Sequence, residues 1–124
     1  MDQREAIERY IAAYNAFDIE EMVSVLHDRV SFQNIAGGTI TTQTVGIDAF
    51  RSTARESAKL FKTRTQTMTS MEPSDHGVLA KIEFVAVLAT DLPNGMKAGD
   101  RLELSGETDF SFMDGKITGI VDRS

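Results

Sequence analysis

Few side chains of this 124-residue chain could transfer a proton near neutral pH. His27 follows a predicted helix within a polar stretch. An imidazole pKa of about 6.5 suits acid–base catalysis, but this corner before a strand favours a solvated or capping histidine. His76 lies in a predicted hairpin turn, where we expect it to face solvent. Tyr10 and Tyr14 are four residues apart, so their phenols lie on one face of a predicted helix and could donate hydrogen bonds.

Other kinds of catalytic motif are missing from the sequence. There is no cysteine, which excludes disulfides, thiolate metal ligands and cysteine nucleophiles. The sequence contains no Gly-rich phosphate loop, His-x-Glu-x-x-His helix, calcium loop or serine elbow. We therefore expect neither a metal site nor a cofactor.

The composition is that of one ordinary globular domain spanning residues 1–124, with 41% hydrophobic and 26% charged residues. The net charge of −6 disfavours nucleic acid and anionic membranes as partners. Lys59, Lys62 and Arg64 form the one candidate basic patch, which is typical of a solvated helix end. The charged N-terminus and the absence of an apolar stretch of roughly 20 residues lead us to expect a cytoplasmic protein.

Three helices are predicted to position the tyrosines and their surroundings. Asp2 and Glu5 suit a helix start, and apolar residues then recur at helical spacing as far as Phe17. A second, shorter helix is expected over residues 19–26, capped by Asp18. A third begins near Ile47 and buries apolar side chains at intervals of three and four: Phe50, Ala54, Ala58 and Phe61.

Strands are predicted elsewhere in the chain. A short strand covers residues 30–34, and a Thr-rich segment over residues 39–44 follows the Gly37-Gly38 break. Three later turn signals separate four strands, over residues 63–73, 78–91, 96–113 and 116–123. Strands of this length, covered by helices on one face, are expected to form a strongly curved sheet.

Alternation along the strands indicates which side chains face the helices. Thr108 and Phe110 belong to the inward set of their strand, whereas Asp109 points outward unless a bulge near Gly106 shifts the register. Val85 and Val87 would give the outer face of the preceding strand an apolar patch. A second copy of the sheet could cover it, so we expect a homodimer through the outer sheet face.

The order of these elements, together with several short motifs, resembles the nuclear transport factor 2-like superfamily. The similarity is greatest to ketosteroid isomerase and the SnoaL-like polyketide cyclases, and it covers nearly the whole chain. The motifs are Arg9-Tyr10-Ile11, Asp18-Ile19-Glu20, Val30-Ser31-Phe32, Gly46-Ile47-Asp48-Ala49-Phe50 and Phe112-Met113-Asp114-Gly115-Lys116-Ile117. The resemblance implies an α+β cone, in which three helices pack on a curved, mixed but mostly antiparallel sheet around an apolar cavity.

The resemblance also implies positions for the site. Ketosteroid isomerase uses an aspartate base and an oxyanion hole made of a tyrosine and a protonated aspartic acid. These positions fall on Asn34, Tyr10 and Thr108, so only the tyrosine matches. An amide cannot accept a proton at neutral pH, which argues against steroid isomerisation by that route. Asp109 would restore a carboxylate if it turned inward, and Arg123 could hold an anionic group.

Further side chains are expected to line the cavity and contact a ligand, and they share an aromatic or thioether character: Tyr14, Met22, Phe32, Phe50, Phe84 and Phe110. Core packing is the alternative for each of them. The expected ligand is a small apolar molecule with a polar group.

Two functions remain open from the sequence. One is an isomerase-, cyclase- or lyase-type enzyme acting on an apolar carbonyl compound, with Tyr10, Asn34 and Thr108 in its site, joined by Asp109 if a bulge turns it inward. The other is a non-catalytic module that binds a hydrophobic ligand or dimerises. A carboxylate or histidine in the cavity near Tyr10 would favour the enzyme, because proton transfer needs a base.

Overall fold

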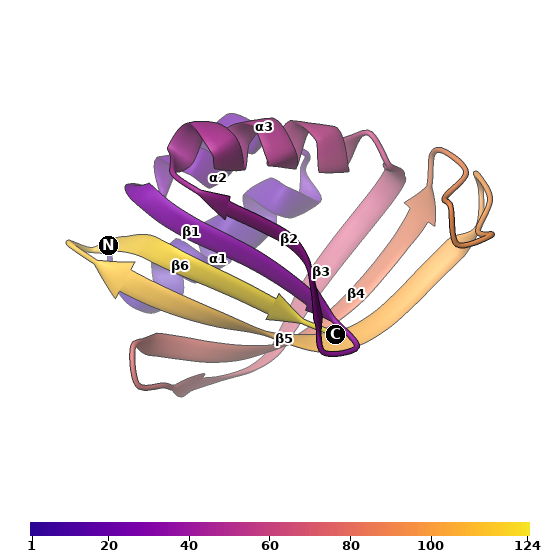
Figure 1. The fold of residues 1–124 in the computed structure, drawn as a ribbon. Helices are drawn as coiled ribbons and strands as arrows, with labels where there is room; N and C mark the ends of the chain where they lie inside the picture. The colour runs from indigo at the N-terminus through magenta and orange to yellow at the C-terminus, as the bar shows by residue number, and fades with distance from the viewer.

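The computed structural model describes residues 1–124 and consists of three helices packed on one six-stranded sheet (Figure 1). The helices are α1 (Gln3–Asn15), α2 (Ile19–Ser24) and α3 (Ile47–Ala58). The strands are β1 (Leu26–Ala36), β2 (Thr39–Val45), β3 (Phe61–Pro73), β4 (Gly77–Leu88), β5 (Arg101–Met113) and β6 (Lys116–Arg123).

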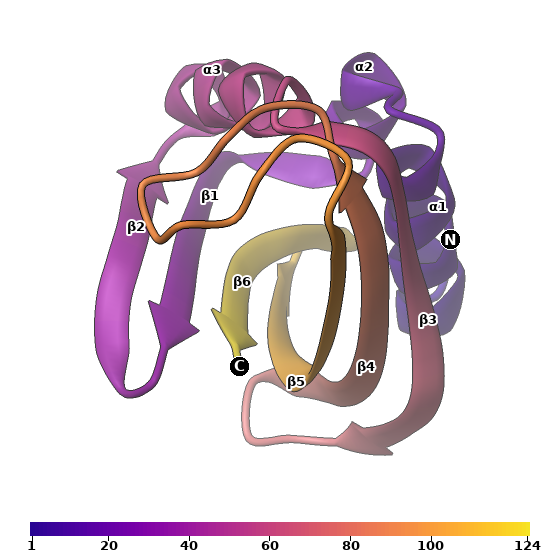
Figure 2. The same cartoon turned by 90° about the vertical axis from the view of Figure 1, so that its right-hand side faces the viewer.

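The sheet has the strand order β2-β1-β6-β5-β4-β3. β1 and β6 pair in parallel, and every other neighbouring pair is antiparallel. Figure 2 shows that the sheet curls strongly, with the helices along its open side. The predicted cone-shaped α+β fold is therefore confirmed.

Local sequence explains where the first two helices begin. The Asp2 carboxylate accepts a hydrogen bond from the Glu5 backbone N–H at 2.7 Å. Asp18 does the same for Glu21 at 3.1 Å. Both contacts satisfy donors that a helix start leaves without intrahelical partners. Between the helices, Phe17 takes a left-handed φ of 58°, which turns the chain sharply from α1 into α2.

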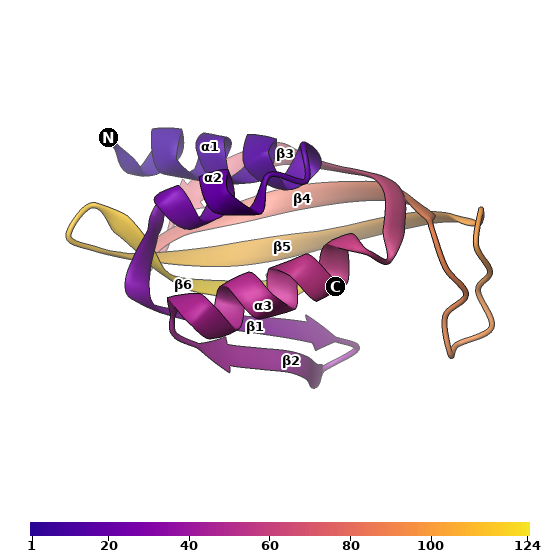
Figure 3. The same cartoon turned by 90° about the horizontal axis from the view of Figure 1, so that it is seen from above.

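The helices lie side by side over the inner face of the sheet (Figure 3). The C-terminal end of α1 is fixed to β3, because the Asn15 side chain donates to the Gln66 carbonyl at 3.0 Å and accepts from its N–H at 2.7 Å. The end of α1 that carries Tyr14 is thus held against the sheet.

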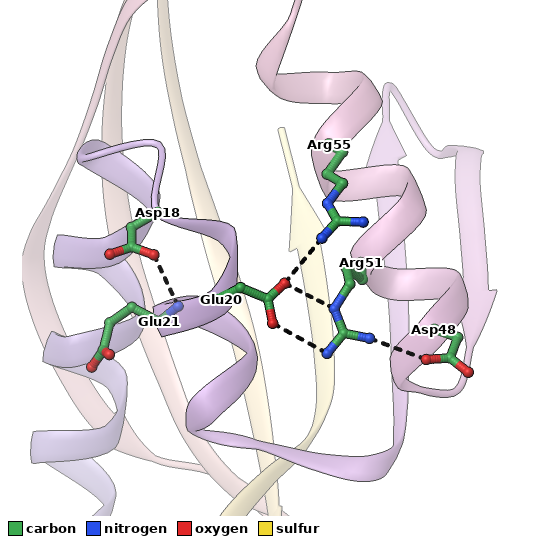
Figure 4. A network of polar contacts seen from close by, with 6 residues as sticks. All are labelled: Asp18, Glu20, Glu21, Asp48, Arg51 and Arg55. Atoms are coloured by element: carbon green, nitrogen blue, oxygen red, sulfur yellow. Dashed lines mark hydrogen bonds and ion pairs between the residues drawn. The ribbon is translucent and has the colours of Figure 1, made fainter.

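A surface network joins α2 to α3 (Figure 4). Glu20 on α2 accepts hydrogen bonds from Arg51 at 2.9 Å and from Arg55 at 3.2 Å, and Arg51 also pairs with Asp48. These groups are largely exposed apart from Arg51, so each pair adds only about 0–1 kcal/mol. The network therefore links α2 and α3 across the surface but adds little to stability.

Several predicted boundaries were wrong. The second helix ends at Ser24 and the third at Ala58, because Leu26 and Phe61 open strands instead. The Thr-rich segment forms β2, which folds back on β1 through a turn at Gly37 and Gly38, whose φ angles are 57° and 82°. β5 begins at Arg101, so residues 89–100 form a long loop that projects from one end of the molecule (Figures 1 and 3).

Candidate functional site

A cavity of about 320 Å³ lies between the helices and the inner face of the sheet. Its size is near the lower end of the range usual for small-molecule sites. Side chains from all three helices and all six strands contribute to its wall. Its polar and charged members include Tyr10, Tyr14, Asn34, Thr42, Arg64, Gln66, Glu107, Thr108, Asp122 and Arg123.

Four of these polar side chains form a row across neighbouring strands. Strand pairing places Thr42 opposite Asn34, Asn34 beside Asp122, and Asp122 opposite Thr108. The Thr108 hydroxyl donates to the Asp122 carboxylate at 2.7 Å. Asn34 donates to the hydroxyl of Thr41, the neighbour of Thr42 in the chain, at 2.8 Å, which fixes the orientation of its amide. The row thus presents the Asp122 carboxylate to the cavity, flanked by neutral groups; Glu107 also lines the cavity, but its carboxylate is partly exposed and paired with Lys81 and Arg123.

The Asp122 carboxyl has an unusual protonation equilibrium. Burial raises its pKa from 3.8 to about 6, although the hydrogen bond from Thr108 opposes the shift by stabilising the charged form. Asp122 is partly exposed as a residue, but protein atoms closely surround its carboxyl group. Asp122 is therefore mostly ionised at pH 7 and close enough to its pKa to release or accept a proton readily.

A bulge in β6 explains why the sequence did not reveal Asp122. Counting alternate residues from the buried Ile117 would place Arg123 inward and Asp122 outward. The β5–β6 register shifts between Ser111 and Phe112, which leaves Thr118 as an extra residue on β6. Ile120 and Asp122 consequently share the inner face with Ile117. The one signal was Gly119, because a glycine inside a strand often marks a bulge.

Tyr10 and Tyr14 face this carboxylate from α1. Tyr10 is 5% exposed, and its ring packs edge-on against Phe110 at 6.0 Å between centroids. Burial first, and then the charge of Asp122, hold the Tyr10 pKa well above 10. Burial raises the pKa of Tyr14 to about 12, and Asp122 adds to the shift while Arg64 opposes it. Both phenols therefore stay protonated and can donate hydrogen bonds.

Arg64 is a buried cation on the same cavity. Its side chain is not the solvated helix end that the sequence indicated: it lies on β3 and is 3% exposed. Its Nε donates to the Tyr14 carbonyl at 2.9 Å, near the C-terminal end of α1 where carbonyls lack intrahelical partners. Burial lowers its pKa, whereas the neighbouring tyrosines raise it.

The other predicted site residues divide into two groups. Those that line the cavity as expected are Tyr10, Tyr14, Met22, Phe32, Asn34, Phe50, Phe84 and Thr108. Arg123 also lines it, but is half-exposed and lies 3.9 Å from the Glu107 carboxylate. Phe110 does not line it; the ring is fully buried in the core behind Tyr10.

Asp109 and His27 lie away from the cavity. The β4–β5 register runs without a shift, so Asp109 keeps its outward direction and accepts a hydrogen bond from Ser74 at 3.2 Å. His27 accepts a hydrogen bond from the Arg29 backbone N–H at 3.0 Å and lies 3.8 Å from Asp114. Neither residue therefore brings an ionisable group to the cavity; the carboxylate beside Asn34 is that of Asp122.

The structure contains no group of three or more histidine, aspartate or glutamate side chains arranged to hold a metal ion. None of its helices has the length and apolar character required to span a membrane.

Comparison with known proteins assigns the family. The model of the SnoaL-like domain family matches residues 7–120. No curated protein sequence matches the chain significantly.

Solved structures share the fold at low sequence identity. A proposed polyketide cyclase from Xanthomonas campestris has a TM-score of 0.78 and 21% identity, covering 98% of this chain and 89% of its own. A second, from Pseudomonas putida, has a TM-score of 0.77 and 19% identity, with coverage of 98% and 90%. An LEH-like epoxide hydrolase from Mycobacterium tuberculosis has a TM-score of 0.74 and 16% identity, with coverage of 96% and 79%.

Proposed function

Because the chain belongs to the SnoaL-like domain family, we propose that it is a small-molecule enzyme of the isomerase or cyclase type. In this proposal Asp122 transfers a proton to and from an apolar carbonyl compound held in the cavity. The observation that carries it is the Asp122 carboxylate in the cavity wall, hydrogen bonded to Thr108 and close enough to Tyr10 to raise that phenol's pKa.

The chemistry begins with the ionised carboxylate. Asp122 accepts a proton from the carbon next to the substrate carbonyl, and the electron pair of the broken C–H bond moves to give an enolate. Tyr10 donates a hydrogen bond to the enolate oxygen, whose negative charge grows as the proton leaves. Returning the proton from Asp122 to another carbon gives an isomer. Alternatively, the enolate carbon attacks a second carbonyl of the same molecule and closes a ring, and the alkoxide formed from that carbonyl takes the proton back from Asp122.

Thr108 and Asn34 take other roles than those implied by ketosteroid isomerase. The Thr108 hydroxyl proton is already directed at Asp122, so Thr108 tunes and orients the base instead of binding the oxyanion. Asn34 lies beside Asp122 in the strand pairing and offers a neutral amide to a substrate oxygen. One carboxylate, one phenol and one amide thus surround the expected reacting group.

The comparisons support a small-molecule substrate. Structures described as polyketide cyclases and as an epoxide hydrolase have this fold over nearly the whole chain. The apolar part of the cavity wall, which includes Phe32, Phe50 and Phe84, suits the body of such a compound.

Exchange of α-hydrogens for deuterium tests the proposal without knowledge of the natural substrate. The probe is 2-tetralone in D₂O, followed by NMR with and without the protein. We expect wild-type protein to accelerate exchange and Asp122→Asn to lose at least about 100-fold of that acceleration, since a positioned base contributes about 10²–10⁴-fold. Asp109→Asn, which alters a carboxylate outside the cavity, is the matched control and should behave as wild type.

Two results would contradict the proposal. One is an equal effect of the Asp122 and Asp109 variants. The other is the absence of exchange above the buffer rate in wild-type protein that binds 2-tetralone, which would favour the non-catalytic binding module.

A further inference from the structure

Arg64 carries a positive charge that the proposed proton transfer does not use. The side chain is 3% exposed, lines the cavity, and donates a hydrogen bond through Nε to the Tyr14 carbonyl. Its Nη2 is buried and has no hydrogen-bond partner. A buried donor without a partner costs about 1–3 kcal/mol, and more in a charged group, so such an arrangement calls for an explanation.

Two aromatic rings stabilise the charge of Arg64. The guanidinium carbon lies 3.7 Å from the centre of the Tyr14 ring and 4.4 Å from that of Phe17. Rings in these positions attract a cation through their faces. The N–H groups of a guanidinium, however, point outward in the plane of the group, where they match the two oxygens of a carboxylate.

No acidic side chain in the protein neutralises Arg64. It takes part in none of the ion pairs of the chain, which join exposed or partly exposed groups. Asp122 faces the same cavity, but its carboxylate accepts a hydrogen bond from Thr108 and forms no ion pair with Arg64. The cavity thus has the buried cation of Arg64 at β3 and the carboxylate of Asp122 at β6, with the two tyrosines of α1 between them. The other charged groups in its wall, Glu107 and Arg123, pair with each other at 3.9 Å.

We propose that Arg64 binds a carboxylate of the ligand, so that the substrate is an apolar carbonyl compound bearing a carboxylate. This inference rests on the proposed function for the reacting end of the substrate. Tyr14, which contacts Arg64, is one helical turn from Tyr10, or about 6 Å along the axis. The carboxylate and the reacting carbonyl are therefore separated by a few bonds.

A pair of probes that differ only in charge tests the inference. 2-Naphthoate is an anion at pH 7.5, and 2-acetylnaphthalene is a neutral ketone of nearly the same shape. Isothermal titration calorimetry should show that wild-type protein binds the carboxylate about 10- to 100-fold more tightly, the range expected for charge-assisted hydrogen bonds. Equal affinity for the two probes, or no binding of either, would overturn the proposal.

Substitutions then assign the preference to the guanidinium. Arg64→Met should abolish the preference for 2-naphthoate and leave 2-acetylnaphthalene binding within about threefold, while Arg64→Lys should keep part of the preference because it retains the charge but not the planar fork. Arg55→Met, the same change on the outer surface of α3, is the control. Circular dichroism checks folding, and Arg64→Lys decides the matter if Arg64→Met does not fold. A preference unchanged in the folded Arg64 variants would also overturn the proposal.

Asp122→Asn separates this inference from the proposed function. If both hold, that variant loses deuterium exchange and still prefers 2-naphthoate. Loss of exchange in Asp122→Asn together with equal binding of the two probes by wild type would refute the role of Arg64 alone. Unaltered exchange in Asp122→Asn together with a preference that depends on Arg64 would refute the proton-transfer role alone.

Discussion

Asp122 is subject to two opposing influences. Burial destabilises its ionised form, and the hydrogen bond from Thr108 stabilises that form; burial is the larger effect, so the pKa rises to about 6. Thr108 is itself 5% exposed, which keeps competing water away from the contact. The pair therefore sets the strength of the proposed base through one short contact of 2.7 Å.

Replacing Thr108 should raise the pKa of Asp122. Thr108→Val keeps the shape of the side chain but removes the donor, so the pKa of Asp122 should rise above its wild-type value of about 6. The ¹³C chemical shift of the Asp122 carboxyl, followed over pH, measures this. Thr42→Val, a change elsewhere in the same row, should leave the midpoint in place. A Thr108 variant that titrates like wild type would contradict the role given to this contact.

The raised pKa also predicts how stability depends on pH. Ionisation of Asp122 is easier in the unfolded chain, with an ordinary pKa of 3.8, than in the folded protein, with a pKa of about 6. Any stability from the neutral carboxyl is thus fully present below pH 3.8 and is lost as the pH rises through about 6. As the pH rises through this range, the free energy of unfolding of Asp122→Asn should therefore increase by up to about 3 kcal/mol relative to that of wild type.

Urea unfolding of both proteins from pH 4 to pH 8 measures that difference. A stability difference that stays constant over this range would mean that the Asp122 carboxyl titrates normally.

At the scale of elements, the sequence predicted most of the fold and part of the site. Caps at Asp2 and Asp18 and the alternation around Thr108 placed α1, α2 and β5 because each depends on local chemistry. β2 was missed because its residues are mostly exposed and carry no buried stripe. Asp122 was missed because a one-residue bulge reverses the faces of β6, and pairing between distant strands decides a bulge.

Gly106 is the position where close packing of β5 against β6 can be tested. It lines the cavity where β5 meets the end of β6. A Cβ there would lie 2.3 Å from the Arg123 carbonyl oxygen, so Gly106→Ala must push the two strands apart. We expect a loss of about 1–3 kcal/mol in unfolding free energy and a weakened Thr108–Asp122 contact. Gly119→Ala, whose Cβ would meet the Ser111 side chain at 3.2 Å, should cost less. Equal urea midpoints for the two variants would contradict this packing argument.

At the scale of the whole molecule, the outer sheet face carries the valines on which the predicted dimer depends. Val85 and Val87 are half-buried there, and strand pairing places Thr65 and Glu103 beside Val85. The apolar patch is therefore narrow. The dimer predicted from the sequence would have to combine these valines with polar contacts around them.

Sedimentation analysis checks this prediction. Wild-type protein should have about twice the 13.7 kDa chain mass, and Val85→Lys should shift it toward the monomer by placing a charge in the contact. Lys81→Ala, a change in an exposed cation of the same face, should not cause full dissociation. A monomeric wild type, or a Val85→Lys dimer of unchanged affinity, would show that this face is not the interface.

The most direct test of the central claim is the pH dependence of deuterium exchange into 2-tetralone. If Asp122 is the base, the wild-type rate should increase with pH around a midpoint near 6 and then level off, because exchange follows the ionised carboxylate. Asp122→Asn should lack this step, while Asp109→Asn keeps it. A wild-type rate with no midpoint near 6, or the same step in Asp122→Asn, would contradict the assignment of Asp122 as the proton-transfer group.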